Sequence, residues 1–336
     1  MSLDTLYHLR EAAALPPKEL IAPLFDVRDE VKDIAQITAP APYLCWARVD
    51  RAGILLINRD LPKDRLGHGT YAKKVYAATF FRISREEIKL CHAAIIKVAT
   101  SSFSATPYHL LSEVPDSPYL GGRTIAQLVK EERNEYVYLI QKRLPKENLQ
   151  ATLSKISIRS DRLSLFLKGM LNTAQGLRLL HEKGLVHRDV RVENSTETQL
   201  YDFNALCKAG PHPINGGATF DIYPPELIKS LHEHIPSLLS QHRTFQELDP
   251  IAYENLPAAP ITVTEEPQII APFLPSFDIY TFGKQFERFY GSPASWTEVF
   301  PLFKLKYLII SMLDFNPSHR PSISIIIEEL SKHIII

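Results

Sequence analysis

The sequence has few cysteines, no excess of either charge and no long apolar run. Its 336 residues include 3 cysteines and carry 38 acidic and 38 basic side chains, for a formal net charge of zero. The positions of Cys45, Cys91 and Cys207 include no Cys-x-x-Cys pair, which argues against a zinc site or a disulfide framework and is typical of a reducing compartment. The mixed charges predict no nucleic-acid partner and no polybasic membrane anchor. We expect a cytoplasmic protein, or a secreted effector delivered to a host cytosol.

A membrane segment is not expected either. The N-terminal stretch MSLDTLYHLREAAAL has no long apolar run behind a basic segment, and no run elsewhere approaches the roughly 20 residues that span a bilayer. Apolar residues still make up 45% of the chain, which is enough for two modest lobes with cores of their own.

The pattern of apolar residues divides the chain into three parts. Residues 1–42 combine short helical patterns with proline-rich breaks, and we interpret them as an N-terminal extension. Residues 43–145 carry alternating apolar segments such as KKVYAATFF and HAAIIKVA, which predict a first lobe made mainly of strands. Residues 146–336 have chiefly helical patterns and form a second lobe.

An insertion at about 230–275 interrupts the second lobe. It follows an amphipathic helical pattern, LIKSLHEHI, and the stretch 227–277 contains seven prolines, which predict extended, exposed chain. A solvated loop is one interpretation, because insertions cost little free energy. The other is an arm that docks a protein substrate or a regulator.

The segment HRDVRVEN, residues 187–194, places a carboxylate and a carboxamide five positions apart. Asp189 and Asn194 are followed by a second carboxylate, Asp202, in the apolar setting LYDFN. Phosphoryl transfer needs a base near the acceptor hydroxyl, a metal that carries the phosphate charge and ligands for that metal, and these three side chains can supply them. A lone His-Arg-Asp is more often a salt bridge in a loop.

The motifs, taken in order, resemble those of the eukaryotic-type protein kinases over roughly residues 60–333. LGHGTYAKKVY looks like the family's glycine-rich loop, Lys97 like its strand lysine and Glu113 like the helix glutamate that orients this lysine. YVYLIQKRLPKENL is similar to the fifth strand and hinge, where Gln141 would guard the adenine pocket and backbone atoms of 142–144 would bind adenine. The cofactor-binding residues implied are Gly67, Gly69, Val75, Lys97, Glu113, Gln141, Lys142 and Leu144. A strand-end lysine that snorkels to solvent and a surface glutamate are the alternatives for Lys97 and Glu113.

The resemblance also assigns the residues of the second lobe. Asp189 takes the position of the catalytic base, Asn194 and Asp202 those of the metal ligands, and Arg191 replaces the usual lysine beside the transferred phosphate. Arginine keeps the positive charge at that position. Tyrosine kinases normally lack a cation there, so the expected acceptor is a serine or threonine hydroxyl.

Three further segments resemble the family's scaffold. YPPE looks like the end of the activation segment, and FDIYTFG like the helix start whose aspartate, Asp278, ties down the catalytic loop. NPSHRP carries Arg320, which the resemblance pairs with Glu226, and two charged residues in such apolar settings usually need each other.

The activation segment predicts activity without loop phosphorylation. Residues 203–225 contain no serine, and their one threonine, Thr219, matches a scaffold position, which leaves Tyr223 as the one further hydroxyl. Arg188, the usual electrostatic partner of a loop phosphate, would then bond nearby backbone carbonyls.

Four departures from the family bear on ATP binding. Ala72 replaces the third glycine of the loop, and Ile95 stands where a smaller alanine normally contacts adenine. Seven residues separate Asn194 from Asp202, too few for two ordinary strands and a turn. Asn204 replaces the glycine after Asp-Phe, a mild change because asparagine tolerates left-handed geometry.

We therefore expect an α+β protein with a bilobal protein-kinase-like fold, a small β-rich N-lobe and a larger helical C-lobe. Retention of Lys97, Asp189, Asn194 and Asp202 favours an active serine/threonine protein kinase that uses ATP with Mg²⁺, or Mn²⁺ in its place. Two alternatives stay open. A pseudokinase scaffold that binds a partner with weak or no turnover would fit the altered glycine loop, and a small-molecule kinase would fit the compact late helices.

Overall fold

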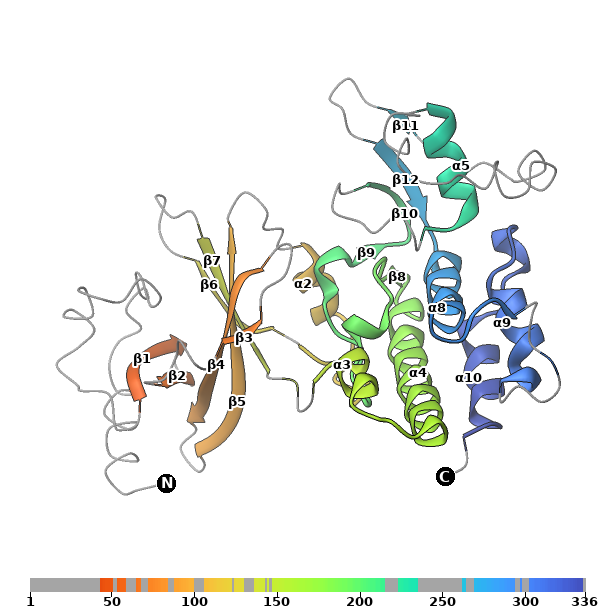
Figure 1. Ribbon diagram of the computed structural model, residues 1–336. Coiled ribbons are helices and arrows are strands. Elements are labelled where there is room, and N and C mark those ends of the chain that lie inside the picture. The colour runs from red at the N-terminus through yellow and green to blue at the C-terminus, as the bar shows by residue number, and fades with distance from the viewer. Residues whose placement is uncertain are drawn as a thin grey trace. The chain divides into compact units, whose positions relative to one another are not determined.

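The computed structural model (Figure 1) describes residues 43–50, 53–58, 65–67, 72–83, 88–99, 106–122, 124–129, 136–142, 144, 147–214, 223–234, 262–263, 269–293, 297 and 302–334. The chain packs as two units: residues 1–104 with 122–145, and residues 105–121 with 146–336. The segment 105–121, which the sequence assigned to the first lobe, therefore packs with the second unit.

The first unit is built on one antiparallel sheet. Its strand order is β1-β2-β4-β5-β7-β6, and β3 pairs with β4 outside this path. The strands are β1 (Tyr43–Asp50), β2 (Gly53–Asn58), β3 (Arg65–Gly67), β4 (Ala72–Ile83), β5 (Ile88–Ala99), β6 (Thr124–Val129) and β7 (Tyr136–Lys142). These include the strands expected from the alternating apolar segments of residues 43–144.

The two longest strands, β4 and β5, owe their length to β-branched and aromatic side chains that favour a pleated backbone. Their register pairs Val75 with Ile96 and Lys74 with Lys97. On its other side β5 pairs with β7, so that Ile95 lies between Tyr76 and Ile140 in the sheet.

The second unit is mainly helical. Its helices are α2 (Thr106–Ser112), α3 (Leu149–Ser154), α4 (Arg159–His181), α5 (Pro225–His234), α8 (Pro275–Tyr290), α9 (Lys306–Met312) and α10 (Ile323–Ser331). Short 3₁₀ turns lie at η3 (Val192–Asn194), η4 (Phe203–Ala205), η8 (Phe303–Leu305) and η9 (Pro317–His319). Among the residues that the structure describes, no helix has both the length and the apolar character needed to cross a bilayer.

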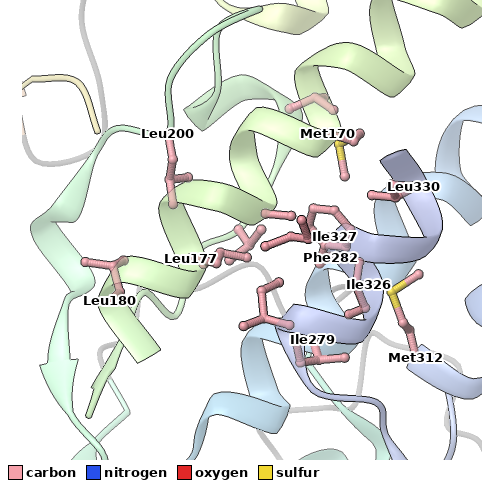
Figure 2. Packing of buried hydrophobic residues seen from close by; sticks show 14 of the residues in the cluster. Met170, Leu177, Leu180, Leu200, Ile279, Phe282, Met312, Ile326, Ile327 and Leu330 are labelled. Carbon is pink, nitrogen blue, oxygen red and sulfur yellow. The ribbon is translucent and has the colours of Figure 1, made fainter. Parts of the chain in front are cut away.

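The main core of the second unit forms where α4, α8 and α10 meet (Figure 2). The buried face of α4 includes Phe166 and Leu177, each 0% exposed. Phe166 meets the ring of Phe286 from α8 edge-on, with centroids 5.2 Å apart, and α10 adds Ile326 to the same cluster. This core fixes α4, which ends shortly before the predicted catalytic loop, and α8, which begins far behind it in sequence.

Short strands complete the second unit. β8 (Leu185–Val186) pairs with β9 (Cys207–Lys208), and β10 (Gly210–Pro213), β12 (Ile269–Phe273) and β11 (Thr262–Val263) form a three-stranded antiparallel sheet in that order. The expectation that the end of the insertion is exposed is wrong for β12, because its alternate residues Ile269, Ala271 and Phe273 are at most 8% exposed. A period of two in burial is what one packed face of a sheet requires.

Candidate active site

The loop that carries Asp189 begins at β8 and is anchored by a buried carboxylate on α8. Asp278 is 0% exposed and accepts the backbone N–H of His187 (2.8 Å) and of Arg188 (2.9 Å). Its Oδ2 also lies 2.9 Å from His181 Nε2 at the end of α4. The prediction that Asp278 ties down this loop is confirmed. Arg188 has a φ of +69°, a left-handed conformation that a non-glycine residue keeps only where its surroundings hold it.

His187 connects the loop with the segment before Asp202. Its side chain is buried, its Nε2 lies 3.1 Å from the Tyr201 carbonyl, and its Nδ1 accepts the backbone N–H of Asp189 at 3.3 Å. With Nδ1 as the acceptor, Nε2 is the ring nitrogen that can donate to the Tyr201 carbonyl. The ring also packs edge-on against Phe203, with centroids 5.3 Å apart.

Asp189 and Asn194, predicted as base and metal ligand, are hydrogen-bonded to each other. Asn194 Nδ2 donates to the Asp189 backbone oxygen (3.0 Å) and to Asp189 Oδ2 (2.7 Å). Arg191 Nε lies 3.4 Å from the other carboxylate oxygen of Asp189. The Asp189 side chain is 30% exposed, so a carboxylate that is held in place still faces solvent.

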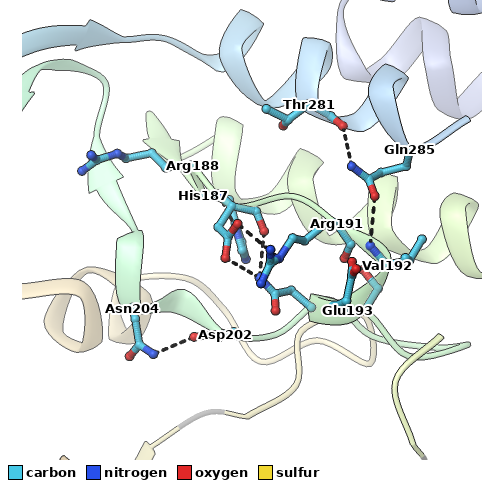
Figure 3. Close-up of polar contacts among 12 residues, drawn as sticks. His187, Arg188, Arg191, Val192, Glu193, Asp202, Asn204, Thr281 and Gln285 are labelled. Atoms are coloured by element: carbon cyan, nitrogen blue, oxygen red, sulfur yellow. Dashed lines mark hydrogen bonds and ion pairs between the residues drawn. The ribbon is translucent and has the colours of Figure 1, made fainter. Parts of the chain in front are cut away.

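The turn η3 is held from α8 by a side chain that the sequence analysis missed. Gln285, 0% exposed, accepts the backbone N–H of Val192 at 3.4 Å and donates to the Thr281 carbonyl at 3.1 Å (Figure 3). A buried amide that joins two elements restricts the loop because each unmade bond would leave a buried polar group. Its signal in the sequence was a glutamine on the helix face that also carries Phe282 and Phe286.

Asp202 lies in a left-handed conformation (φ +62°) directly before η4. Asn204 Nδ2 donates to Asp202 Oδ1 at 2.6 Å (Figure 3), and Tyr108 of α2 donates its hydroxyl to Asn204 Oδ1. The tolerance of asparagine for left-handed geometry, noted from the sequence, is not used here. Asn204 lies within the right-handed turn η4, and Asp202 takes the left-handed conformation. Asn204 instead orients the Asp202 side chain.

The charges around Asp202 suit a cation. The Asp202 side chain reaches solvent, yet desolvation by the surrounding protein and then the negative charge of Asp189 raise the pKa of its carboxyl. Tyr201 donates its backbone N–H to the Asn194 carbonyl at 2.9 Å, so Asn194 and the residue before Asp202 lie on adjacent backbone segments. A hard divalent cation takes oxygen ligands and relieves repulsion between carboxylates.

Asp202 and Asn194 could hold such a cation in part. Since Asn194 Nδ2 donates to Asp189, the oxygen Oδ1 is the atom of this amide that can ligate a metal. Within the described ranges, no three His, Cys, Asp or Glu side chains converge as a metal site. A cation here would therefore need further oxygens from a ligand or water, which is how Mg²⁺ is held in nucleotide sites.

The short connection 195–201 closes with a tight turn. Thr196 donates its backbone N–H to the Gln199 carbonyl (2.7 Å), and its hydroxyl oxygen accepts the backbone N–H of Thr198 and of Gln199. One bridge joins Ser195 to Leu200, and Leu200 also pairs in parallel with Leu120. This segment therefore takes its backbone partners from residues 119–121 as well as from itself, as expected for a loop too short for two full strands.

The predicted nucleotide-binding residues lie mostly in the first unit. Gly67 ends β3 opposite Val75 of β4, Lys97 lies in β5, and Gln141 and Lys142 end β7. Leu144 follows β7 and is half-buried, and Gly69 lies outside the described residues.

Glu113, the predicted partner of Lys97, lies just beyond the end of α2, where its backbone N–H bonds to the Leu110 carbonyl and its side chain is exposed. The two residues belong to different units. Their pairing therefore stays a prediction.

The predicted ion pair between Arg320 and Glu226 is confirmed. Both guanidinium nitrogens Nη1 and Nη2 donate to the Glu226 carboxylate, at 2.8 and 2.7 Å, and the Arg320 side chain is 0% exposed. Arg320 also donates to the carbonyls of Ser276 and Asp314. It therefore joins α5, the start of α8 and η9.

Comparison with known proteins gives one coarse result. No protein-family model matches the chain. The chain is similar to a probable serine/threonine-protein kinase of Dictyostelium discoideum, with 26% identity over 175 residues, or 49% of this chain. The match covers 21% of that protein, so the chain spans about a fifth of the length of the curated relative it matches. The similarity supports a kinase-like function at a coarse level.

Proposed function

We propose that this protein is a kinase of bilobal kinase-like fold that transfers the γ-phosphate of ATP to serine or threonine hydroxyls of a protein substrate. The observation that carries the proposal is the arrangement of Asp189 and Asn194, hydrogen-bonded to each other at the end of a loop that Asp278 anchors. The similarity to a probable serine/threonine-protein kinase supports the same reaction class.

The residues of the loop divide the chemistry among them. Mg²⁺, when bound, neutralises charge on the phosphates. Asp189 would orient the acceptor hydroxyl and receive its proton, with Asn194 fixing one carboxylate oxygen. Arg191, 3.4 Å from the other oxygen, would keep positive charge beside the transferred group. Asp202 and Asn194 would ligate the cation, and Lys97 would pair with the phosphates.

Activity without activation-loop phosphorylation is part of the proposal. Tyr223 is 3% exposed and packs edge-on against Phe277, so its hydroxyl is a poor substrate for another kinase. Arg188 donates to the Pro213 carbonyl at 2.8 Å, in line with the structural role expected from the sequence. Docking of a protein substrate by the 230–275 insertion stays a prediction, because residues 235–261 lie outside the described part of the chain.

The test is phosphate transfer from labelled ATP with Mg²⁺, by the purified protein alone and with a generic protein acceptor. Asp189→Ala should lower the rate by about 10²- to 10⁴-fold, the range that a positioned base contributes, and Asp202→Ala should lower it by removing a cation ligand. Asp161→Ala, at an exposed carboxylate in the first turn of α4, is the matched control and should transfer as the parent does.

Three outcomes would contradict the proposal in different ways. Transfer that survives in both active-site variants would place the activity in a contaminant. No transfer, together with no rise in melting temperature on adding ATP and Mg²⁺, would indicate a scaffold that works by binding. Transfer to small hydroxyl compounds but not to protein would indicate a small-molecule phosphotransferase.

A further inference from the structure

The segment that follows Asp202 is paired with the insertion. Strand β10 belongs to this segment and lies beside β12 from the insertion, in the register Gly210 to Phe273 and His212 to Ala271. Ile214 continues the ladder by donating its backbone N–H to the Ile269 carbonyl at 2.7 Å. We refer to β10, β11 and β12 as the clamp sheet. Residues more than 50 positions apart in sequence thus meet in one sheet.

The prolines of the clamp sheet occupy positions that need no N–H. In an antiparallel pair, hydrogen-bonded and non-hydrogen-bonded positions alternate. Because Ile214 and Ile269 are bonded, the alternation makes Pro211, Pro213 and Pro272 members of non-bonded pairs. The ladder therefore tolerates three prolines that would each interrupt the opposite register.

The same alternation explains how the clamp sheet reaches the catalytic loop. At a non-bonded position the carbonyl points away from the partner strand. The Pro213 carbonyl accordingly accepts Arg188 Nη2 at 2.8 Å. The Arg188 guanidinium carbon also lies 3.8 Å from the centre of the Phe273 ring, within the range of a cation–π contact. β10 thus supplies a carbonyl acceptor for Arg188, and β12 supplies an aromatic ring.

Arg188 is thus held at both ends. Its backbone N–H is bonded to Asp278, and its side chain lies between Pro213 and Phe273. The left-handed backbone conformation of Arg188 is strained for a non-glycine residue, and it persists only where several contacts hold it. The next residue is Asp189, so a release of the guanidinium would change where that carboxylate points.

We propose that Phe273 is a positioning residue, and that the clamp sheet keeps Asp189 in place by fixing the Arg188 guanidinium. The inference deepens the proposed function and rests on it for the role of Asp189. It assigns to the insertion a task other than docking, since β12 holds the segment after Asp202 without any covalent modification.

A purely structural role for Phe273 is the competing explanation. Phe273 is 0% exposed and belongs to a small core with Val186, Tyr223 and Phe277, whose ring centroid lies 5.1 Å from its own. Phe277 provides the matched control. Phe277 is also a phenylalanine, and it is 3% exposed in the same core. The guanidinium of Arg188 stacks on Phe273, so a change at Phe277 tests the loss of core packing.

The first measurement is hydrogen exchange in the full chain, which does not depend on activity. Phe273→Leu should raise the exchange rate on the order of tenfold at residues 187–189 and at the amides of Gly210, His212 and Ile214, as expected when a partly desolvated cation–π contact is lost. Phe277→Leu should lower the melting temperature by a similar amount and leave the exchange at 187–189 unchanged. Equal exchange at 187–189 in both variants would overturn the proposal. Phe273→Met, whose unbranched and flexible side chain adapts better to the space of the ring, serves if Phe273→Leu does not fold.

The second measurement is kinetic and uses a double-mutant cycle. Phe273→Leu should lower kcat about tenfold and leave the affinity for ATP unchanged, whereas Phe277→Leu should change neither. In the background of Arg188→Met, Phe273→Leu should have no further effect on kcat, because both changes remove the same contact. Additive effects would overturn the proposal. If the parent protein transfers no phosphate, the proposed function fails, and the exchange experiment still decides whether the clamp sheet holds the loop.

Discussion

At the scale of single residues, two buried charges of the second unit neutralise each other. Arg320 and Glu226 form a bidentate pair, and Arg320 additionally stacks 4.9 Å from the centre of the Tyr280 ring. Removing a charge from water costs several kcal/mol, and a pair offsets that cost only when its geometry is good. A buried pair of this kind is more sensitive to the loss of one partner than to the loss of both.

We expect Arg320→Met to destabilise the protein by about 3–5 kcal/mol, because it leaves the Glu226 carboxylate without its main partner in a buried place. The double variant Arg320→Met/Glu226→Met should recover part of that loss. The measurement is urea unfolding of the two variants and the parent. A single variant within about 1 kcal/mol of the parent would show that solvent reaches the carboxylate.

Cys207 has a buried thiol whose pKa is raised by its surroundings. The thiol is 5% exposed, and burial raises its pKa from 9.0 to about 11, with the Asp278 charge acting in the same direction and Arg188 against it. The folded protein therefore holds the thiol proton more tightly than the unfolded chain does. This stabilisation is fully present below pH 9 and is lost as the pH rises towards 11.

The stability difference between the parent and Cys207→Ala should therefore depend on pH. Between pH 8 and pH 11 the parent should lose roughly 2–3 kcal/mol more unfolding free energy than the variant does, since two pKa units correspond to that amount. Denaturant unfolding at several pH values measures it. A constant difference across this range would mean that the thiol titrates alike in both states.

At the scale of elements, α4 is the helix against which the loop before Asp202 is packed. A Cβ atom on Gly176 would lie 2.9 Å from the Tyr119 carbonyl oxygen and 3.1 Å from Leu200 Cβ. The glycine lets the helix approach two backbone segments closely, and these segments are joined by the bond from the Leu200 N–H to the Tyr119 carbonyl.

Gly176→Ala should destabilise the protein by about 1–2 kcal/mol, even though alanine is favoured over glycine in a helix by up to about 1 kcal/mol. Gly169→Ala on the same helix is the comparison, because its new Cβ would meet the side chain of Leu149 rather than backbone. Thermal unfolding of the two variants should show the larger loss for Gly176→Ala. A larger loss of stability for Gly169→Ala would show that the neighbours of Gly176 give way more easily than Leu149 does.

The clamp sheet shows where reasoning from the sequence stopped at the level of elements. Seven prolines in residues 227–277 correctly indicated extended chain around β12. They did not indicate burial, because a proline-rich strand is compatible with a sheet only in one register, and the register depends on the partner strand β10.

At the scale of the whole molecule, the two units are not consecutive halves of the sequence. Residues 105–121 pack with 146–336, and they contribute Leu110, Leu111, Val114 and Leu120 to the main core of the second unit. Each is at most 7% exposed. Four such side chains contribute about 6–12 kcal/mol by burial, which is comparable with the whole stability of a domain.

A fragment of residues 146–336 should consequently fail to unfold cooperatively. The same fragment preceded by residues 105–121 through a Gly-Ser linker should show a cooperative transition, because the missing side chains are restored to its core. Circular dichroism during heating compares the two fragments. Cooperative unfolding of 146–336 alone would show that the core closes without α2.

The sequence by itself determined the local motifs, the strand segments of residues 43–144 and two long-range partnerships. The pairings of Asp278 with the loop 187–194 and of Arg320 with Glu226 were predicted from the resemblance of FDIYTFG, YPPE and NPSHRP to protein-kinase segments. For Arg320 and Glu226, the need of a buried charge for a partner pointed the same way. The nucleotide-binding assignments, Lys97 with Glu113 among them, stay predictions.

The tertiary structure alone decided which side chains support the loop and Asp202. Three of these contacts join residues far apart in sequence: Gln285 with Val192, Tyr108 with Asn204, and Phe273 with Arg188. No local pattern encodes such intervals. The contact of Asn204 with Asp202 spans two positions. Local propensity and periodicity report on neighbours within a few residues. The burial of β12 and the packing of residues 105–121 with the second unit depend on contacts between distant segments, which exist only once the chain has folded.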